Sequence, residues 1–173
     1  MKDILDKAAR VRLVIFDVDG VLTDGSLFVG DDGQEYKAFN SRDGHGIKML
    51  IKHGVIVAII TGRTSKVVEH RMENLGIEHV YQGKLDKLPA YEELAGELGI
   101  SAAETAYVGD DIVDLPVMRR VGLAIAVQDA HPLVRTHSHW QTPSCGGRGA
   151  ARDVCEMLME ARGVLEQEMS SYL

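Results

Sequence analysis

The sequence predicts an α/β fold, a doubly wound parallel sheet, from three observations. Short apolar runs rich in Val and Ile recur along the chain, as expected for strands that are covered on both faces. Segments with apolar residues at helical spacing alternate with these runs, and such alternation favours a parallel sheet. Polar clusters containing Asp, Gly, Thr and Lys directly follow several of the runs, at the position where open α/β sheets bind ligands.

The elements follow from these patterns in chain order. Strands are expected at 11–16, 55–60, 77–81, 105–108 and 123–127, and helices at 47–54, 64–75, 88–98, 112–120 and 154–168. Two short apolar stretches around a Gly-Asp-Asp-Gly turn predict a hairpin insert at about 25–40. The segment 140–149 is rich in Gly, Ser and Pro and is expected to be a loop. We therefore expect a single domain over 1–173, with a C-terminal tail from about 140 and no large cap domain.

Composition restricts the possible functions. The chain has 173 residues, of which 45% are hydrophobic, enough for one compact core. Its 26 acidic and 19 basic residues give a net charge of −7, which argues against a nucleic-acid-binding surface. An anionic substrate would therefore need a local cationic site. Two cysteines form neither a disulfide scaffold nor a zinc motif, and neither a leader nor a membrane-length apolar run is evident, so we expect a cytoplasmic protein.

The segment LVIFDVDGVLTD, residues 13–24, is the most informative part of the chain. Side chains alternate along an extended strand, so Asp17 and Asp19 would point into the same cavity at the strand's carboxyl end. Two like charges held together require a cation or a shared proton. The alternative is an ordinary acidic turn after a strand, because Asp and Gly are common turn residues.

Three further polar clusters follow predicted strands. Thr61-Gly62-Arg63 could contact phosphate oxygens, or could form a helix-capping turn. Lys84 or Lys87 could neutralise phosphate charge, or could be a solvated surface group. Asp110, Asp111 and Asp114 lie within five residues, which is costly without a counter-ion and favours a metal site over a solvated loop. Acidic oxygen ligands with few imidazoles suit Mg²⁺ rather than zinc.

The order of the four clusters, DVDGVLTD, TGR, a lysine and GDDIVD, resembles the motifs of the haloacid dehalogenase-like phosphohydrolases. Over roughly residues 10–160 the chain is also similar to one group of that family, the 3-deoxy-D-manno-octulosonate (KDO) 8-phosphate phosphatases. The narrower resemblance is carried by the hairpin GSLFVGDDGQEYKAF, residues 40–46, the run GDDIVDLPVM and residues 146–152.

The resemblance implies a mechanism and a set of site residues. Asp17 would be the nucleophile that forms an aspartyl-phosphate, and Asp19 would protonate the leaving sugar oxygen and then activate water. Mg²⁺ would be held by the Asp17 carboxylate, the Asp19 carbonyl and Asp110, with Asp111 and Asp114 as supports. Lys87, rather than Lys84, would pair with Asp17 and phosphate. The residues implied for substrate binding are Asp19, Gly46, Thr61, Gly62, Arg63, Arg71 and Lys87.

The group is also implied to form homotetramers, in which the hairpin and Arg148 could serve a neighbouring subunit's site. An exposed apolar hairpin fits an interface, although an ordinary edge hairpin explains the sequence equally well. Two alternatives to KDO 8-phosphate hydrolysis remain at this point. One is a phosphatase for a nonulosonate 9-phosphate or another sugar phosphate. The other is a non-hydrolytic receiver domain, which the order of the lysine and the second acidic cluster disfavours.

Overall fold

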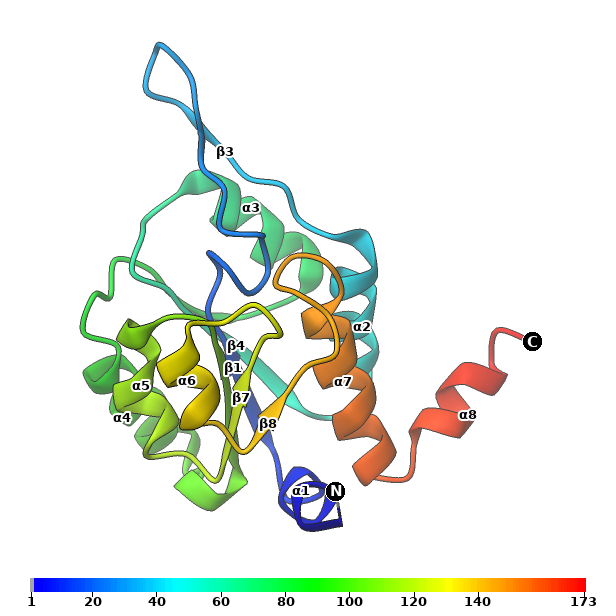
Figure 1. Ribbon diagram of the computed structural model, residues 1–173. Helices are drawn as coiled ribbons and strands as arrows, with labels where there is room; N and C mark the ends of the chain where they lie inside the picture. Colours follow the sequence, from blue (N-terminus) through cyan, green and yellow to red (C-terminus); the bar gives the residue numbers. More distant parts are fainter. Residues whose placement is uncertain (1) are drawn as a thin grey trace.

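The centre of the computed structural model, which describes residues 2–173, is a six-stranded parallel sheet (Figure 1). The strand order is β5-β4-β1-β6-β7-β8, and every neighbouring pair is parallel. The doubly wound α/β prediction is therefore confirmed. The strands are β1 (Leu13–Phe16), β4 (Ile56–Ile60), β5 (His79–Tyr81), β6 (Thr105–Gly109), β7 (Leu123–Ala126) and β8 (Trp140–Gln141).

Helices cover both faces of the sheet, with α2 and α7 on one side and α4, α5 and α6 on the other (Figure 1). Glycines in the left-handed conformation end α3 and α4, because a residue without a Cβ adopts positive φ at little cost. The helices are α1 (Lys2–Ala8), α2 (Ser41–Lys52), α3 (Lys66–Leu75), α4 (Leu88–Leu98), α5 (Leu115–Met118), α6 (Pro132–Thr136), α7 (Ala150–Ala161) and α8 (Leu165–Ser170), with 3₁₀ turns at Ala102–Glu104 and Ile112–Asp114.

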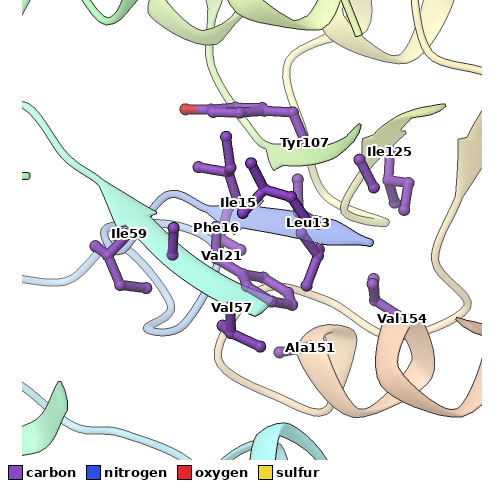
Figure 2. Packing of buried hydrophobic residues seen from close by; sticks show 14 of the residues in the cluster. Leu13, Ile15, Phe16, Val21, Val57, Ile59, Tyr107, Ile125, Ala151 and Val154 are labelled. Atoms are coloured by element: carbon purple, nitrogen blue, oxygen red, sulfur yellow. The ribbon is translucent and has the colours of Figure 1, made fainter. Parts of the chain in front are cut away.

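The hydrophobic core is centred on β1, whose four residues are completely buried. Ile15 lies in register with Ala58 of β4 and Tyr107 of β6, so apolar side chains from three strands meet on each face. Figure 2 shows Phe16 of β1 together with Val154 of α7, which packs from the helical layer. Burial of β1 on both faces explains why it reads as a continuous apolar run.

A small antiparallel hairpin, β2 (Phe28–Val29) and β3 (Glu35–Tyr36), interrupts the α/β alternation after β1. It forms its own two-stranded sheet and projects beyond the body of the molecule (Figure 1). The hairpin expected at about 25–40 is thus confirmed. Its apolar side chains are largely uncovered, and Phe28 and Val29 are 58% and 64% exposed.

The C-terminal part of the chain differs from the sequence-based expectation. The single helix predicted at 154–168 is wrong: the segment contains α7 and α8, separated at Gly163, whose φ of 72° does not continue a helix. The stretch 140–149, expected to be a loop, begins with the edge strand β8. The helices α1 and α6 were also not predicted. Within residues 2–173, none of the helices has the length and apolar composition needed to cross a membrane.

The order of the strands determines where a ligand can bind. From β1 the chain proceeds to β4 and β5 on one side, and then crosses to β6 on the other side of β1. Ligand sites of doubly wound sheets lie at such a reversal, beyond the carboxyl ends of the strands. The loops that follow β1 and β6 therefore meet at this position, and these loops carry the two acidic clusters.

Candidate active site

Asp17 is held at the end of β1 in a defined orientation. Its Oδ1 accepts a hydrogen bond of 2.7 Å from the backbone N–H of Val18, and its Oδ2 lies 2.9 Å from Nζ of Lys87. The side chain is buried, yet Asp17 borders a cavity of about 180 Å³. Burial, followed by the nearby Asp114 carboxylate, raises the pKa of Asp17 to about 6. The residue is thus a fixed carboxylate beside a small pocket.

Lys87 lies at the start of α4 and is one of the largest fully buried side chains of the protein. Besides Asp17, its ammonium contacts Asp114 Oδ1 at 2.6 Å. The Asp114 carboxylate also accepts hydrogen bonds from the hydroxyl of Tyr107 and from the backbone N–H groups of Asp110 and Asp111. With four donors, Asp114 is occupied as a support that orients the lysine and the second acidic loop.

Asp110, unlike Asp114, has a carboxylate oxygen without a hydrogen-bond donor among residues 2–173. Its Oδ1 is buried and accepts no hydrogen bond from any described residue, and such groups are rare unless an ion or water satisfies them. Burial and the Asp114 and Asp17 carboxylates raise the pKa of Asp110 to about 8. A Cβ on Gly20 would overlap the Asp110 carboxylate, so only glycine lets the first acidic loop approach it.

The acidic groups form a site that fits a divalent cation. Oxygen atoms of Asp17, Asp110 and Asp114 lie within 4.8 Å of one another. When all three carboxylates are ionised, they and the Lys87 ammonium leave two net negative charges, which would repel a phosphate ester. One divalent cation removes this excess, and a site made of oxygen ligands suits Mg²⁺. Asp110 Oδ1 has no hydrogen-bond donor among the described residues, and each Asp17 oxygen has a single partner, whereas Asp114 accepts four hydrogen bonds.

The residues that follow β4 form another wall of the cavity. Thr61, Gly62 and Arg63 line it together with the two acidic loops and Lys87. A volume of about 180 Å³ is smaller than the roughly 300–1,000 Å³ usual for ligand pockets, so it accommodates a phosphoryl group rather than a whole sugar phosphate. Lys84 is exposed and does not line the cavity, so the geometry favours Lys87 as the lysine of the site.

Two predicted substrate-binding residues lie outside the lining of this cavity. Gly46 is buried in α2, where an added Cβ would lie 2.8 Å from Cδ of Arg152 on α7, so close helix packing explains the glycine. The guanidinium of Arg71 lies 5.7 Å from the ring centre of Phe39 and donates to the Asn40 carbonyl. Their contact with substrate stays a prediction, as does that of Arg148, which pairs with Asp24 at 3.0 Å.

Sequence reasoning missed Lys37, which directly follows β3. Its side chain is completely covered, and its ammonium pairs with Asp19 and with Oε1 of Glu35 at 2.9 Å. Glu35 in turn pairs with Arg63. Because Glu35 and Lys37 alternate with the exposed Tyr36, the strand pattern did indicate that both point to one side. The chain's own hairpin therefore contributes charge to its site.

Asp43 is a second residue that sequence reasoning missed, and it fixes the segment that packs against the first acidic loop. It is buried in the first turn of α2 and accepts hydrogen bonds from the backbone N–H groups of Gly149 and Arg152 at the start of α7. This contact holds the segment 146–149 against the first acidic loop, where the Gly147 N–H donates to the Val21 carbonyl at 2.8 Å. An added Cβ on Gly146 would overlap the Gly20 carbonyl, which explains the glycines there.

A parallel sheet with two facing acidic loops and a buried lysine at its carboxyl edge is typical of proteins in which an aspartate accepts a phosphoryl group. The family model described as haloacid dehalogenase-like hydrolase matches residues 78–152. The 3-deoxy-D-manno-octulosonate 8-phosphate phosphatase of Yersinia pestis is 51% identical over 164 residues, which cover 95% of this chain and 88% of that relative. The chain therefore belongs to the haloacid dehalogenase-like hydrolases and, within them, to the family of these phosphatases.

Solved structures agree with this assignment. The Yersinia pestis phosphatase has a TM-score of 0.94 at 51% identity, covering 95% of this chain and 89% of that one. The phosphatase of Moraxella catarrhalis, solved in complex with a magnesium ion, a phosphate ion and a KDO molecule, has a TM-score of 0.98 at 40% identity. The match covers 100% of this chain and 99% of that one.

Proposed function

We propose that this enzyme is a Mg²⁺-dependent phosphatase that hydrolyses KDO 8-phosphate to KDO and phosphate, a step that supplies a precursor of lipopolysaccharide. The observation that carries the proposal is identity of 51% over nearly the whole chain with a phosphatase of this name. The Moraxella structure, which holds magnesium, phosphate and KDO, adds support because its fold matches over the whole chain.

The first chemical step uses Asp17 and Asp19. A carboxylate oxygen of Asp17 attacks phosphorus, forming a P–O bond as the bond to the sugar oxygen breaks. The proton of Asp19 moves to the departing sugar oxygen, so the sugar leaves as an alcohol. The hydrogen bond from Val18 and the ion pair with Lys87 hold the Asp17 carboxylate in place for this attack.

The second step hydrolyses the aspartyl-phosphate. Asp19, now ionised, takes a proton from a water molecule whose oxygen attacks phosphorus, and the bond to Asp17 breaks to release phosphate. Thr61 and Gly62 border the cavity and would hold phosphate oxygens, while Lys87 offsets their charge. Asp17, Asp110 and the Asp19 carbonyl would hold Mg²⁺, which would supply the positive charge that a phosphate dianion needs to approach three carboxylates.

Initial rates on three substrate classes test this function. The purified enzyme would be assayed with KDO 8-phosphate, a nonulosonate 9-phosphate and hexose phosphates, each with Mg²⁺ and with EDTA. The proposal expects the highest kcat/KM for KDO 8-phosphate and loss of turnover in EDTA. A preference for the nonulosonate 9-phosphate would reassign the substrate, and a stable phosphoprotein without turnover would identify a receiver-type domain.

We further propose that the enzyme is a cytoplasmic homotetramer. The support for association of subunits is the apolar hairpin, on which four side chains are between 44% and 64% exposed: Leu27, Phe28, Val29 and Tyr36. Such a surface on a marginal two-stranded element is stabilised when another subunit covers it. Light scattering coupled to size exclusion should then give about four times the chain mass of 18.9 kDa, and a monomer would contradict the proposal.

A further inference from the structure

We propose that Lys37 and Arg63 form a subsite for the carboxylate of the substrate, and that Glu35 occupies this subsite until substrate displaces it. The inference rests on the proposed function, because it requires a sugar acid that carries a carboxylate as well as a phosphate. It assigns the hairpin of the same chain a direct part in specificity. Glu35 would then be an internal competitor for the substrate's carboxylate.

The position of Lys37 is the first argument. Its side chain has no exposed surface, and a lysine is almost never fully buried unless it is paired. Its two partners are Asp19, which lines the phosphate cavity, and Glu35 of the hairpin. The ammonium therefore lies beside the catalytic cavity, on the side from which the hairpin projects. A group held there can contact the part of a substrate that extends out of the small cavity.

The second argument is the way in which Glu35 is held. One of its oxygens contacts the Lys37 ammonium at 2.9 Å, and the other pairs with the guanidinium of Arg63, a residue that lines the cavity. Two cations that converge on one carboxylate are the donors that a substrate carboxylate would need. The hydrogen bonds from Lys37 and Arg63 keep the pKa of Glu35 below its usual range, so this side chain is an anion at neutral pH.

Charge balance gives the third argument. In the free enzyme Lys37 and Arg63 share one carboxylate, that of Glu35. A bound substrate carboxylate would add a second negative charge beside Glu35 and next to the phosphoryl group. Departure of Glu35 removes this repulsion, because one carboxylate replaces another on the same two cations. The exchange would make binding selective for substrates that bring a carboxylate.

Glu35 can leave without movement of the hairpin. The partners of its carboxylate are the Lys37 ammonium and the Arg63 guanidinium, so a rotation of its side chain breaks these two ion pairs and leaves the backbone in place. The hairpin itself would stay fixed in the proposed tetramer, where another subunit covers its exposed apolar face.

Two substitutions test the inference, one that removes a negative charge and one that removes a positive charge. Glu35→Gln removes the competing anion with little change of shape, and Lys37→Met removes one cation. The exposed Asp31 on the same hairpin provides a matched control, because Asp31→Asn changes a carboxylate to an amide away from Lys37. The measured quantities are the dissociation constant of KDO, determined calorimetrically with Mg²⁺, and the ratio of kcat/KM for KDO 8-phosphate to that for a hexose 6-phosphate.

We expect Glu35→Gln to tighten KDO binding and raise the substrate ratio, each by about 3-fold or more. Lys37→Met should weaken KDO binding about 10-fold or more, as expected for a lost charge-assisted hydrogen bond. Asp31→Asn should change neither quantity. Unchanged or weaker KDO binding by Glu35→Gln would overturn the inference, since it would make Glu35 a structural support. The dissociation constant of KDO is measured without hydrolysis. A wild-type enzyme that binds KDO but does not hydrolyse KDO 8-phosphate would therefore refute the proposed function and not this inference.

Discussion

Mg²⁺ should stabilise this protein more at pH 8 than at pH 5.5, because the cation replaces protons on buried carboxylates. The pKa of Asp17 rises from 3.8 to about 6 and that of Asp110 from 3.8 to about 8 in the folded chain without metal. An acid whose pKa is raised by folding retains its proton in the folded state after the unfolded chain has lost it. Without metal, stability should therefore fall as pH rises from about 4 towards 8.

The expected size follows from these shifts. The rise of about two pKa units at Asp17 alone corresponds to about 3 kcal/mol lost once the pH exceeds 6. Mg²⁺ at 100 times its dissociation constant returns about 2.7 kcal/mol, which for a chain of this length raises Tm by about 5–10 °C. At pH 5.5 protons compete with the cation for Asp110, so the Tm shift should be several-fold smaller.

Thermal unfolding monitored by calorimetry, with MgCl₂ or EDTA at pH values from 5 to 8.5, measures this effect. Asp110→Asn should abolish the Mg²⁺ shift, and without metal at pH 8 it should be more stable than wild type because a costly buried carboxylate is gone. Asp111→Asn, which changes the exposed neighbouring carboxylate, should retain the wild-type shift. Equal Tm shifts at pH 5.5 and pH 8, or a full shift in Asp110→Asn, would refute the reasoning.

Three further substitutions test individual roles. Asp17→Asn should reduce turnover about 10³-fold or more while the fold and much of the phosphate binding persist, and undiminished hydrolysis would refute the nucleophile assignment. Asp19→Asn should cost about 10²–10⁴-fold on a sugar phosphate and far less on an aryl phosphate, whose leaving group needs no proton, so equal losses would contradict the acid role. Gly46→Ala should lower the free energy of unfolding by about 1–3 kcal/mol through overpacking against Arg152, and unchanged stability would contradict the packing argument. The predicted contact of Gly46 with substrate requires KM to rise as well, and an unchanged KM would leave helix packing as the role of this glycine.

The central sheet could be predicted from sequence because its signals are local. The apolar run of β1 is buried on both faces, and Gly76 and Gly99 end their helices in the left-handed conformation. The edge strand β8 could not be predicted in this way. It has only two residues, Trp140 and Gln141, and pairs with β7 at a single edge, so tertiary contact rather than apolar periodicity determines it.

In the candidate site, too, residues in local motifs could be predicted from the sequence, whereas pairs formed by long-range packing could not. Asp17, Asp110 and Lys87 could be identified because each follows a strand in an order typical of one family. The pairing of Lys37 with Asp19 joins the hairpin to the first loop, and that of Asp43 with Gly149 joins residues more than a hundred positions apart. Contacts of this kind depend on how elements pack, and one sequence contains no periodic pattern that reveals them.

Burial explains why the acidic residues of the site have different roles despite their identical chemistry. Asp114 is completely buried and accepts four hydrogen bonds, so its carboxylate orients Lys87 and the second acidic loop. Asp110 is placed one turn away with a buried oxygen that no described residue satisfies. A carboxylate in that state is unfavourable until a cation binds. We therefore expect a Mg²⁺ ion that binds beside Asp110 to remove an electrostatic cost that the folded chain otherwise bears.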